Sequence, residues 1–152
     1  MSRIAIIPAH VDHVPVLARA MRGADRAEVA ALGHTPAGAL ELSLRAAAEA
    51  WTGTVDDEPA VMFGVADLGE GIGEPWLLGT ERVVRHQVAF LRRNRAYVDR
   101  LLMPGRWSTL RNRVDSRNEV SLRWLSWLGF VLGPAEPWGP RHLPFHPFWR
   151  SA

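Results

Sequence analysis

The sequence predicts a single α+β domain, and three of its properties support this prediction. Its 152 residues fit one domain with a hydrophobic core, so we expect residues 1–152 to fold as one unit. The chain has no cysteine, which excludes a disulfide framework and a cysteine nucleophile. Apolar residues form strand-like runs in some segments and follow helical spacing in others. No apolar run approaches the roughly 20 residues of a membrane span, and the first apolar stretch is too short for a signal peptide, so we expect a soluble, unprocessed protein.

The first half of the sequence predicts a strand, three helices and a meander of three strands. Residues 3–9 have the β-branched, apolar content of a strand, and the next apolar residues recur at helical spacing: Val11, Val14, Leu17 and Met21. A second helix ends at Gly33. Thr35 and Pro36 provide a cap and a first-turn proline for a third helix over residues 37–50. Apolar runs bounded by turn residues then predict strands over residues 51–55, 59–68 and 75–80.

The second half begins with a long amphipathic helix over residues 81–103, for which Thr80 is the expected cap. One face of this helix is apolar and predicted to be buried: Val84, Val88, Leu91, Val98 and Leu102. A strand over residues 107–116 follows. It leads to a second helix, which we expect to begin with a capping box between Ser116 and Glu119.

Two tryptophans lie three residues apart in this second helix. Trp124 and Trp127 fall on a wide apolar face, and burying such a ring contributes about 2–3 kcal/mol, so we expect both in the core. Gly129 fits the position after the last helical turn. Residues 130–138 and 142–149 predict a final pair of strands, and two prolines in the latter predict that it lies at a sheet edge: Pro144 and Pro147.

Charged residues divide the chain into an acidic first part and a basic middle part. Residues 1–80 contain 5 arginines and 11 acidic residues, whereas residues 81–117 contain 10 arginines and 3 acidic residues. The pI of about 10.3 overstates the net charge of +2, because the chain has no lysine or cysteine that would titrate below arginine. The arginine block 82–117 fits DNA phosphates, an acidic protein partner or a solvated surface. No recognisable nucleic-acid motif accompanies the block.

Two pairs of histidines are candidate metal ligands: His10 with His13, and His142 with His146. Two such pairs with no link between them in the sequence fit capping and surface roles better than a metal site. We therefore expect no bound metal.

Several segments resemble the GNAT acyltransferases. The order of elements is similar to that fold, and RVDSRNEVSLRWLSWLGF resembles its last part, where an asparagine opens a helix and Leu-Gly-Phe follows it. More narrowly, MFGVADL, PWLLGT, HQVAFLRRNRAYVDRLL and PFHPFW together resemble a family of phage-encoded internal virion proteins with a GNAT-like (acyl-CoA N-acyltransferase) fold. The resemblance covers most of the chain. It implies a three-layer fold with a central mixed, mostly antiparallel sheet flanked by helices.

The resemblance also implies a site for acetyl-CoA. In active GNAT enzymes a loop of the form Gln/Arg-x-x-Gly-x-Gly/Ala holds the diphosphate with backbone N–H groups. The corresponding segment here reads LLGTERVVRHQV and has no glycine between Gly79 and Gly105. If acetyl-CoA binds, five residues are expected to hold it: Leu78, Gly79, Arg82, Arg85 and Asn118.

Catalytic residues expected from the resemblance are also missing. GNAT enzymes commonly use a tyrosine seven residues after the helix-opening asparagine to protonate the leaving thiolate, and here that residue is Leu125. The single tyrosine, Tyr97, is expected to pack within the long helix. A general base would come from one of three carboxylates of the meander, each of which also fits a solvated strand end: Glu58, Asp67 and Glu74. The sequence therefore assigns no catalytic residue.

Two functions remain open. The favoured interpretation is an internal virion or morphogenesis protein of a phage or prophage, without acetyltransferase activity or cofactor. It would bind other virion or assembly proteins, or further copies of itself, in the virion or the bacterial host cytoplasm. The alternative is an acetyl-CoA-dependent N-acetyltransferase acting on an unidentified amine. These two interpretations differ in whether the strands around Gly79 open into a pocket for a pantetheine arm or whether tryptophans fill that space: Trp76, Trp107, Trp124 and Trp127.

Overall fold

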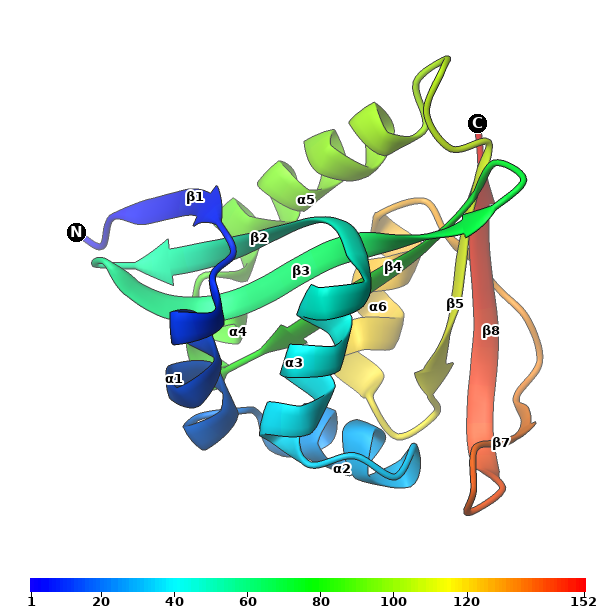
Figure 1. Ribbon diagram of the computed structural model, residues 1–152, viewed down its shortest axis with the longest axis horizontal. Helices are drawn as coiled ribbons and strands as arrows, with labels where there is room; N and C mark the ends of the chain where they lie inside the picture. Colours follow the sequence, from blue (N-terminus) through cyan, green and yellow to red (C-terminus); the bar gives the residue numbers. More distant parts are fainter.

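An eight-stranded, mostly antiparallel sheet forms the centre of the molecule, and helices cover both of its faces (Figure 1). The computed structural model describes all residues 1–152. The strands are β1 (Ile4–Pro8), β2 (Ala47–Val55), β3 (Glu58–Gly69), β4 (Ile72–Gly79), β5 (Thr109–Asp115), β6 (Val131–Leu132), β7 (Glu136–Trp138) and β8 (Leu143–Ser151). The helices are the short 3₁₀ turn η1 (Val11–His13), α1 (Val14–Arg19), α2 (Gly23–Ala31), α3 (Pro36–Ala46), α4 (Glu81–Arg85), α5 (Gln87–Leu101) and α6 (Glu119–Trp127). The predicted fold class is confirmed.

The sheet opens between its two parallel strands. Its strand order is β1-β2-β3-β4-β5-β8-β6, with β7 also paired to β8. All neighbours are antiparallel except β4 and β5, which pair at only two positions, Ile72 with Thr109 and Gly73 with Leu110. Beyond these pairs the two strands diverge, as Figure 1 shows. A gap therefore forms in the middle of the sheet.

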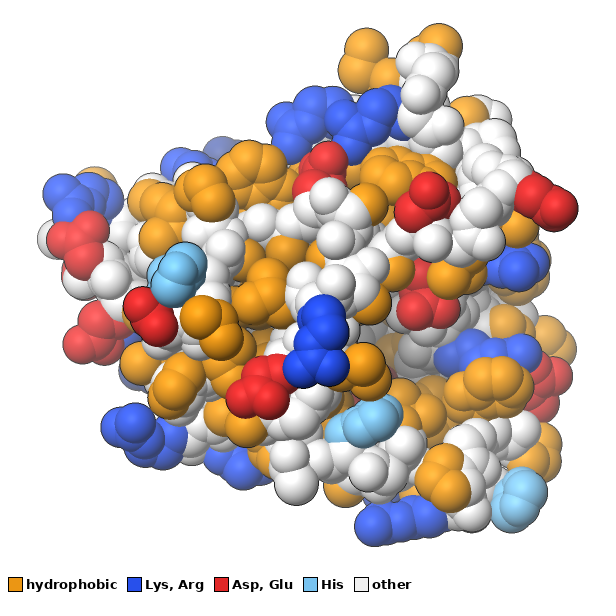
Figure 2. Space-filling view, viewed as in Figure 1, with side chains coloured by type: hydrophobic (Ala, Val, Ile, Leu, Met, Phe, Trp, Pro, Cys, Tyr) orange, Lys and Arg blue, Asp and Glu red, His pale blue; other side chains and the backbone are white.

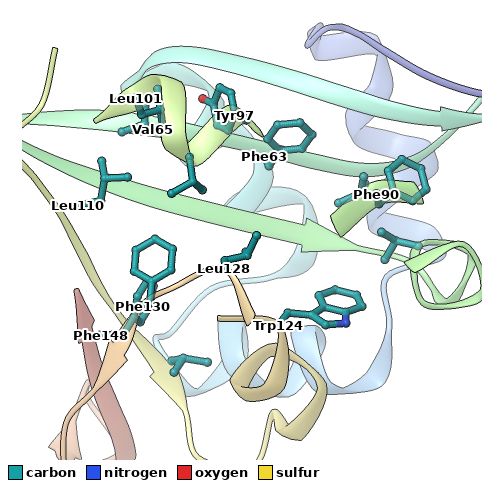
Figure 3. Packing of buried hydrophobic residues seen from close by; sticks show 14 of the residues in the cluster. Phe63, Val65, Phe90, Tyr97, Leu101, Leu110, Trp124, Leu128, Phe130 and Phe148 are labelled. Carbon is teal, nitrogen blue, oxygen red and sulfur yellow. The ribbon is translucent and has the colours of Figure 1, made fainter. Parts of the chain in front are cut away.

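Alternating side chains of the central strands separate two hydrophobic clusters. On β3, Phe63 packs toward α5, α6 and β8 in the larger cluster (Figure 3), whereas Met62 packs toward helices α1–α3. Edge-to-face ring pairs, each with centroids 5.2 Å apart, join Phe63 to Tyr97 and Phe130 to Phe148. The period-two alternation of the strand places helices on both faces.

Two expectations for the first half need correction. The helix predicted over residues 37–50 ends at Ala46, because the following alanines pair with β3, from Ala47 opposite Ala66 onward. Tertiary pairing overrides the high helix propensity of alanine here. The helix expected from Val11 onward is confirmed only for α1, and Val11 itself is 56% exposed. The cap at Thr35 is confirmed, since its Oγ1 accepts a hydrogen bond from the Gly38 N–H at 3.0 Å.

The long helix predicted over residues 81–103 is broken at His86 into α4 and α5. The break changes the helix phase, so Val88 is 64% exposed and Phe90 is buried instead. Thr80 does not cap the helix, because its hydroxyl donates to the carbonyl of Ala60 at 2.9 Å. None of the helices is both long enough and apolar enough to cross a membrane.

The last part of the chain differs from the prediction in three details. Asn118, not Ser116, is the N-cap of α6, and Trp127 is 46% exposed while Trp124 is buried. Strand β8 lies between β5 on one side and β6 and β7 on the other, so it is not an edge strand. Its prolines are tolerated because Pro147 turns toward the two-residue strand β6, and Pro144 turns toward the end of β5.

Candidate functional site

A cavity of about 500 Å³ fills the opening between β4 and β5. This volume lies within the range of small-molecule sites. Helices α2 and α3 line it on one face of the sheet, and α5 and α6 line it on the other. Figure 2 shows the surface hollowed beside α3, on the face covered by α2 and α3. The cavity therefore passes through the sheet and is lined from both of its faces.

Strand β4 has one backbone position, Leu77, that lies between two bonded positions on the edge facing this cavity. The carbonyl of Pro75 accepts a hydrogen bond from the Asn112 side chain at 2.9 Å, and the Gly79 N–H donates to Asp25 at 2.9 Å. Both groups point away from β3, and backbone groups alternate sides along an antiparallel strand. The N–H and C=O of Leu77, midway between them, therefore point toward the gap. A free N–H at this position can donate to the carbonyl oxygen of a bound acyl group.

Two carboxyl groups line the cavity. The carboxylate of Glu28 on α2 accepts a hydrogen bond from the Asp115 N–H at 2.8 Å. Burial, with help from the nearby charges of Asp25 and Asp115, raises the pKa of Glu28 to about 7. Burial also raises the pKa of Glu74 on β4, against the opposing charge of Arg111. A carboxyl group with a pKa near 7 is suited to act as a general base at neutral pH.

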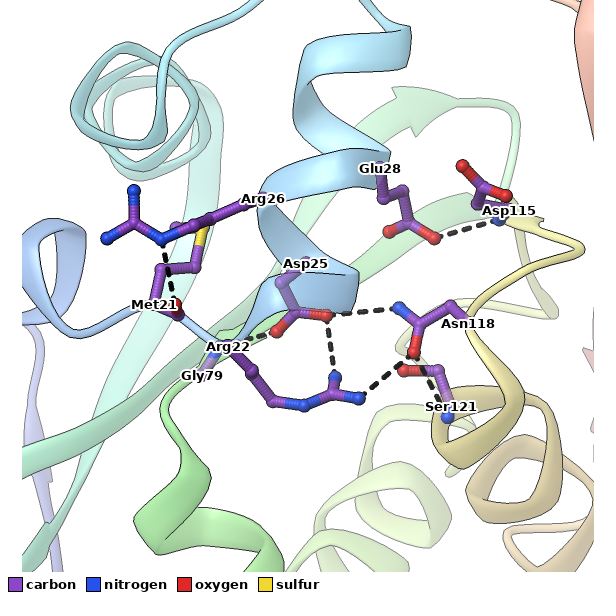
Figure 4. Close-up of polar contacts among 9 residues, drawn as sticks. All are labelled: Met21, Arg22, Asp25, Arg26, Glu28, Gly79, Asp115, Asn118 and Ser121. Atoms are coloured by element: carbon purple, nitrogen blue, oxygen red, sulfur yellow. Dashed lines mark hydrogen bonds and ion pairs between the residues drawn. The ribbon is translucent and has the colours of Figure 1, made fainter.

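A buried ion pair holds together the elements next to the cavity (Figure 4). The Arg22 guanidinium donates to Asp25 at 2.7 Å and to the Asn118 side-chain oxygen at 3.2 Å, and all three side chains are at least 95% buried. The Asn118 side-chain nitrogen donates to Asp25 at 3.0 Å, and its oxygen also accepts the Ser121 N–H. These bonds join α2, the end of β4 and the start of α6. Asn118 is therefore fully engaged within the protein.

The residues that the sequence proposed for the diphosphate do not form a clasp. Arg82 is turned toward Glu58 at 2.9 Å and toward the Val55 carbonyl at 3.2 Å. Arg85 is exposed at the end of α4. The backbone is helical where the resemblance implies a glycine-rich loop, and the His86 N–H donates to the Arg82 carbonyl at 3.1 Å. This backbone N–H is therefore used by the helix, and neither it nor the Arg82 side chain is free for the diphosphate of CoA.

A hydrogen bond joins α5 and α6 beside the cavity. The Trp124 indole N–H donates to the Gln87 side-chain oxygen at 3.0 Å. Leu78 lines the cavity, whereas Gly79 is tied to Asp25 through its N–H. Leu125 also lines the cavity and has no proton to give. The lining at Leu78 and Leu125 is therefore apolar, whereas Arg82 and Asn118 are already engaged within the protein.

Only one of the three proposed bases is near the cavity. Glu58 is exposed and paired with Arg82, and Asp67 is exposed, with its pKa lowered by hydrogen bonds from the Gly69 N–H and the Trp107 indole. Glu74 lines the cavity. Tyr97 packs on Phe63 as expected; burial and the Glu49 charge raise its pKa, and its hydroxyl has no hydrogen-bond partner.

The tryptophans do not fill the space. Trp76 and Trp124 line the cavity and leave it open, and the indole N–H of Trp76 has no partner within the protein. Trp107 and Trp127 lie outside the lining. The space around Gly79 is therefore an open pocket and is not filled by tryptophans, which favours a ligand-binding protein.

No group of three or more metal-ligating side chains gathers anywhere in the structure. His10 caps η1 by accepting the Asp12 N–H at 3.0 Å, and His13 contacts the Thr52 hydroxyl at 2.8 Å. His146 bonds to the Gly133 carbonyl at 2.9 Å. These histidines therefore have capping and packing roles.

Sequence reasoning missed the buried charges of α2. Asp25 and Glu28 are three residues apart on one helix face; Asp25 points toward Asn118 at the start of α6, and Glu28 points toward Asp115 at the end of β5 (Figure 4). In the sequence, the sign of these residues was the spacing of two acids three residues apart in a short helix that also contains a valine. No feature of the sequence indicates the free Leu77 N–H, because this group becomes free only through the divergence of β5 from β4.

Comparisons with known proteins place this fold among acetyltransferases. No protein-family model and no curated protein matches the sequence. One similar solved structure is a GNAT-family acetyltransferase from Streptococcus pneumoniae, with a TM-score of 0.66 and 14% identity over 99% of this chain and 100% of that chain. A second is RimL, a ribosomal L7/L12 α-N-protein acetyltransferase in complex with coenzyme A, with a TM-score of 0.69 and 13% identity over 97% of this chain and 93% of that chain. A third is the aminoglycoside acetyltransferase AAC(6′)-Ib in complex with coenzyme A, with a TM-score of 0.68 and 11% identity over 98% of this chain and 95% of that chain. The chain thus has the GNAT fold. None of these three is described as a virion protein, and at identities of 11–14% the likeness shows the fold alone.

Proposed function

We propose that this protein is an N-acyltransferase that transfers an acyl group from a pantetheine thioester, acetyl-CoA in the first instance, to an amine. The observation that carries the proposal is the cavity between β4 and β5, which is lined by residues from both faces of the sheet and has a free backbone N–H at Leu77 and a titratable carboxyl at Glu28. Similar folds in RimL and AAC(6′)-Ib, both solved with coenzyme A, support it.

In this mechanism the two faces of the cavity have different roles. Glu28 and Glu74 attract the ammonium form of the acceptor on the α2 and α3 side. Glu28 accepts a proton from the ammonium group, and the freed amine forms a C–N bond to the thioester carbonyl carbon. The Leu77 N–H donates to the carbonyl oxygen as negative charge develops on it. The C–S bond then breaks, and the nitrogen gives its remaining extra proton to solvent. Solvent supplies the proton to the thiolate, because Leu125 occupies the place of an acid, and Glu28 returns its proton to solvent.

The absence of a diphosphate clasp has a measurable consequence. The chain grips only the acyl group and the pantetheine arm, so we expect acetyl-pantetheine and acetyl-CoA to have similar KM values. A GNAT enzyme that grips the diphosphate strongly gives a much lower KM for acetyl-CoA. On the acceptor side, the apolar lining from α2 and α3 predicts an amine with an apolar body: Val29, Leu32, Ala39 and Leu42.

Thiol release provides the direct assay. The chain has no cysteine, so a thiol reagent reports only the product of the reaction. We expect amine-dependent release of CoA, lowered at least tenfold in Glu28→Gln, with a rate that rises through pH 7 in the unmodified protein. The matched control is Glu41→Gln, an exposed carboxylate on α3, which should retain full activity. Absence of amine-dependent release across cationic and apolar amines would remove the proposal.

A second function has one specific observation in its favour. Helix α4 lies where the resemblance implies the diphosphate loop of an active GNAT enzyme, and Gln87 and Trp124 are joined to each other by a hydrogen bond. On this view the fold is a scaffold without catalysis, as the internal virion interpretation requires. It predicts no stabilisation by acetyl-CoA or acetyl-pantetheine at millimolar concentration in a thermal-shift titration. Peptides of this protein in purified phage particles would be the separate test of a virion location and of assembly partners.

A further inference from the structure

The structure divides the arginine block into paired and unpaired members. Four of its ten arginines form ion pairs with carboxylates: Arg82, Arg106, Arg113 and Arg117. Six have no carboxylate partner: Arg85, Arg92, Arg93, Arg95, Arg100 and Arg111. Five of these six lie on α4 and α5. The charge that the sequence shows as one block is therefore concentrated on the outer surface of these helices.

The unpaired arginines continue onto α6 through an exposed tryptophan. The guanidinium of Arg95 lies over the Trp127 ring at 4.9 Å and donates to the Trp127 carbonyl at 3.2 Å. Arg123 precedes Trp127 by one helical turn and is also exposed and unpaired. Arg92 lies one turn before Arg95 on the exposed side of α5. We call this surface, formed by Arg92, Arg95, Arg123 and Trp127, the α5–α6 face.

Acidic residues do little to balance this surface. Asp99 of α5 is bound to Arg150 at 2.6 Å. Glu81 and Glu119, in the first turns of α4 and α6, are the only other acids of these three helices. Exposed arginines outnumber these acids, so electrostatic interactions favour the binding of a polyanion at this surface. Trp127 remains 46% exposed, although its apolar ring would be more stable buried.

From this juxtaposition we propose that the α5–α6 face binds single-stranded nucleic acid. The guanidinium groups of Arg92, Arg95 and Arg123 contact backbone phosphates, and the indole of Trp127 stacks on a base. Cationic side chains beside an exposed aromatic ring are the features by which single strands are held without sequence preference. A duplex offers its phosphates but no free base for the indole, and the carboxylates of an acidic protein cannot stack on the indole. This inference is independent of the acyltransferase proposal, since the face lies outside the cavity lining.

Fluorescence anisotropy of a labelled 20-nucleotide single strand tests the proposal with the full chain. We expect Arg92→Gln combined with Arg95→Gln to weaken binding at least tenfold. The control combines Arg19→Gln with Arg45→Gln, two exposed, unpaired arginines on α1 and α3, which remove the same charge elsewhere. This control should change binding less than twofold. Loss of two phosphate contacts should also reduce the magnitude of the slope of log K against log salt by about 1.4.

Trp127→Ala distinguishes a single strand from other polyanions. We expect this variant to weaken single-strand binding about fivefold or more and to leave weaker duplex binding unchanged. Circular dichroism of each variant verifies that the fold is intact. Equal losses in the two arginine pairs would show non-specific charge attraction and overturn the proposal. Competition by polyglutamate as effective as that by the single strand would also overturn it, in favour of an acidic protein partner.

Discussion

Replacing Glu28 by glutamine removes one titrating carboxyl from the cavity and keeps an oxygen that can accept the Asp115 N–H. Because the pKa of Glu28 is raised from 4.5 to about 7, the folded protein binds this proton more tightly than the unfolded chain does. Its contribution to stability is therefore greatest below pH 4.5, decreases as the pH rises toward 7, and is constant above that. The carboxylate of Glu28 thus destabilises the fold at alkaline pH.

The size of the effect follows from the two pKa values. A difference between 4.5 and about 7 corresponds to about 3 kcal/mol, at roughly 1.4 kcal/mol per pH unit. We expect Glu28→Gln to be more stable than the unmodified protein at pH 8.5, by on the order of 1–3 kcal/mol relative to their difference at pH 4. Asp25 and Glu74, whose pKa values are also raised by burial, titrate in both proteins, so their effect largely cancels in the comparison.

Urea unfolding followed by tryptophan fluorescence measures this difference at each pH. The Glu41→Gln control, in an exposed position of α3, should follow the unmodified protein closely. If the stability difference between Glu28→Gln and the unmodified protein is the same at pH 4 and pH 8.5, then the carboxyl is not held in its neutral form by burial. The assignment of Glu28 as a base near neutral pH would then be wrong.

Three further outcomes follow from the site. Asp25→Ala should lower the free energy of unfolding by about 3–5 kcal/mol in urea titration, because it leaves a buried guanidinium without its carboxylate, and a loss below 1 kcal/mol would contradict that role. Ser121→Trp should fill the cavity and abolish thioester binding in calorimetry, whereas Ser126→Trp, on the exposed side of the same helix, should bind normally. Leu77→Pro should lower kcat at least tenfold because it removes the backbone N–H, and Leu77→Val, which keeps this N–H, should not; equal effects would exclude a role for the N–H.

Much of the fold follows from local patterns in the sequence. Thr35 with Pro36, the glycine after the turn of α6 and the alternating apolar residues of β3 each specify an element through nearby residues alone. Gly129, for example, adopts φ +89°, a conformation in which a side chain would be strained. These signals suffice because capping and left-handed turns depend on a few consecutive residues.

Errors arose where distant contacts decide the structure. Ala47 leaves its helix because β3 supplies a partner strand, and β8 accepts two prolines because its neighbours are short or end nearby. Trp127 follows the same helical pattern as Trp124, yet only Trp124 meets the core. A helical spacing predicts which residues share a face, and the packing of other elements decides how wide the buried face is.

The candidate site could be predicted only in part. A resemblance to GNAT proteins indicated the strands around Gly79 as the place of the site, and the structure has a cavity there that Leu78 lines. It could not show that Asn118 is engaged by Arg22 and Asp25, since these residues are more than 90 positions apart in the sequence. The pKa of Glu28 likewise depends on burial by the rest of the fold.

The most direct test of the account is a ¹⁵N NMR titration of the full chain with acetyl-CoA and, separately, with acetyl-pantetheine. The account predicts saturable shifts for both ligands, largest for the amide of Leu77 and for its neighbours across the gap on β5, with similar affinities. The amide signals of the α5–α6 face should not shift when acetyl-pantetheine is added. Unchanged amides along β4 at millimolar ligand, or shifts confined to the arginine-rich surface, would contradict a thioester site between β4 and β5.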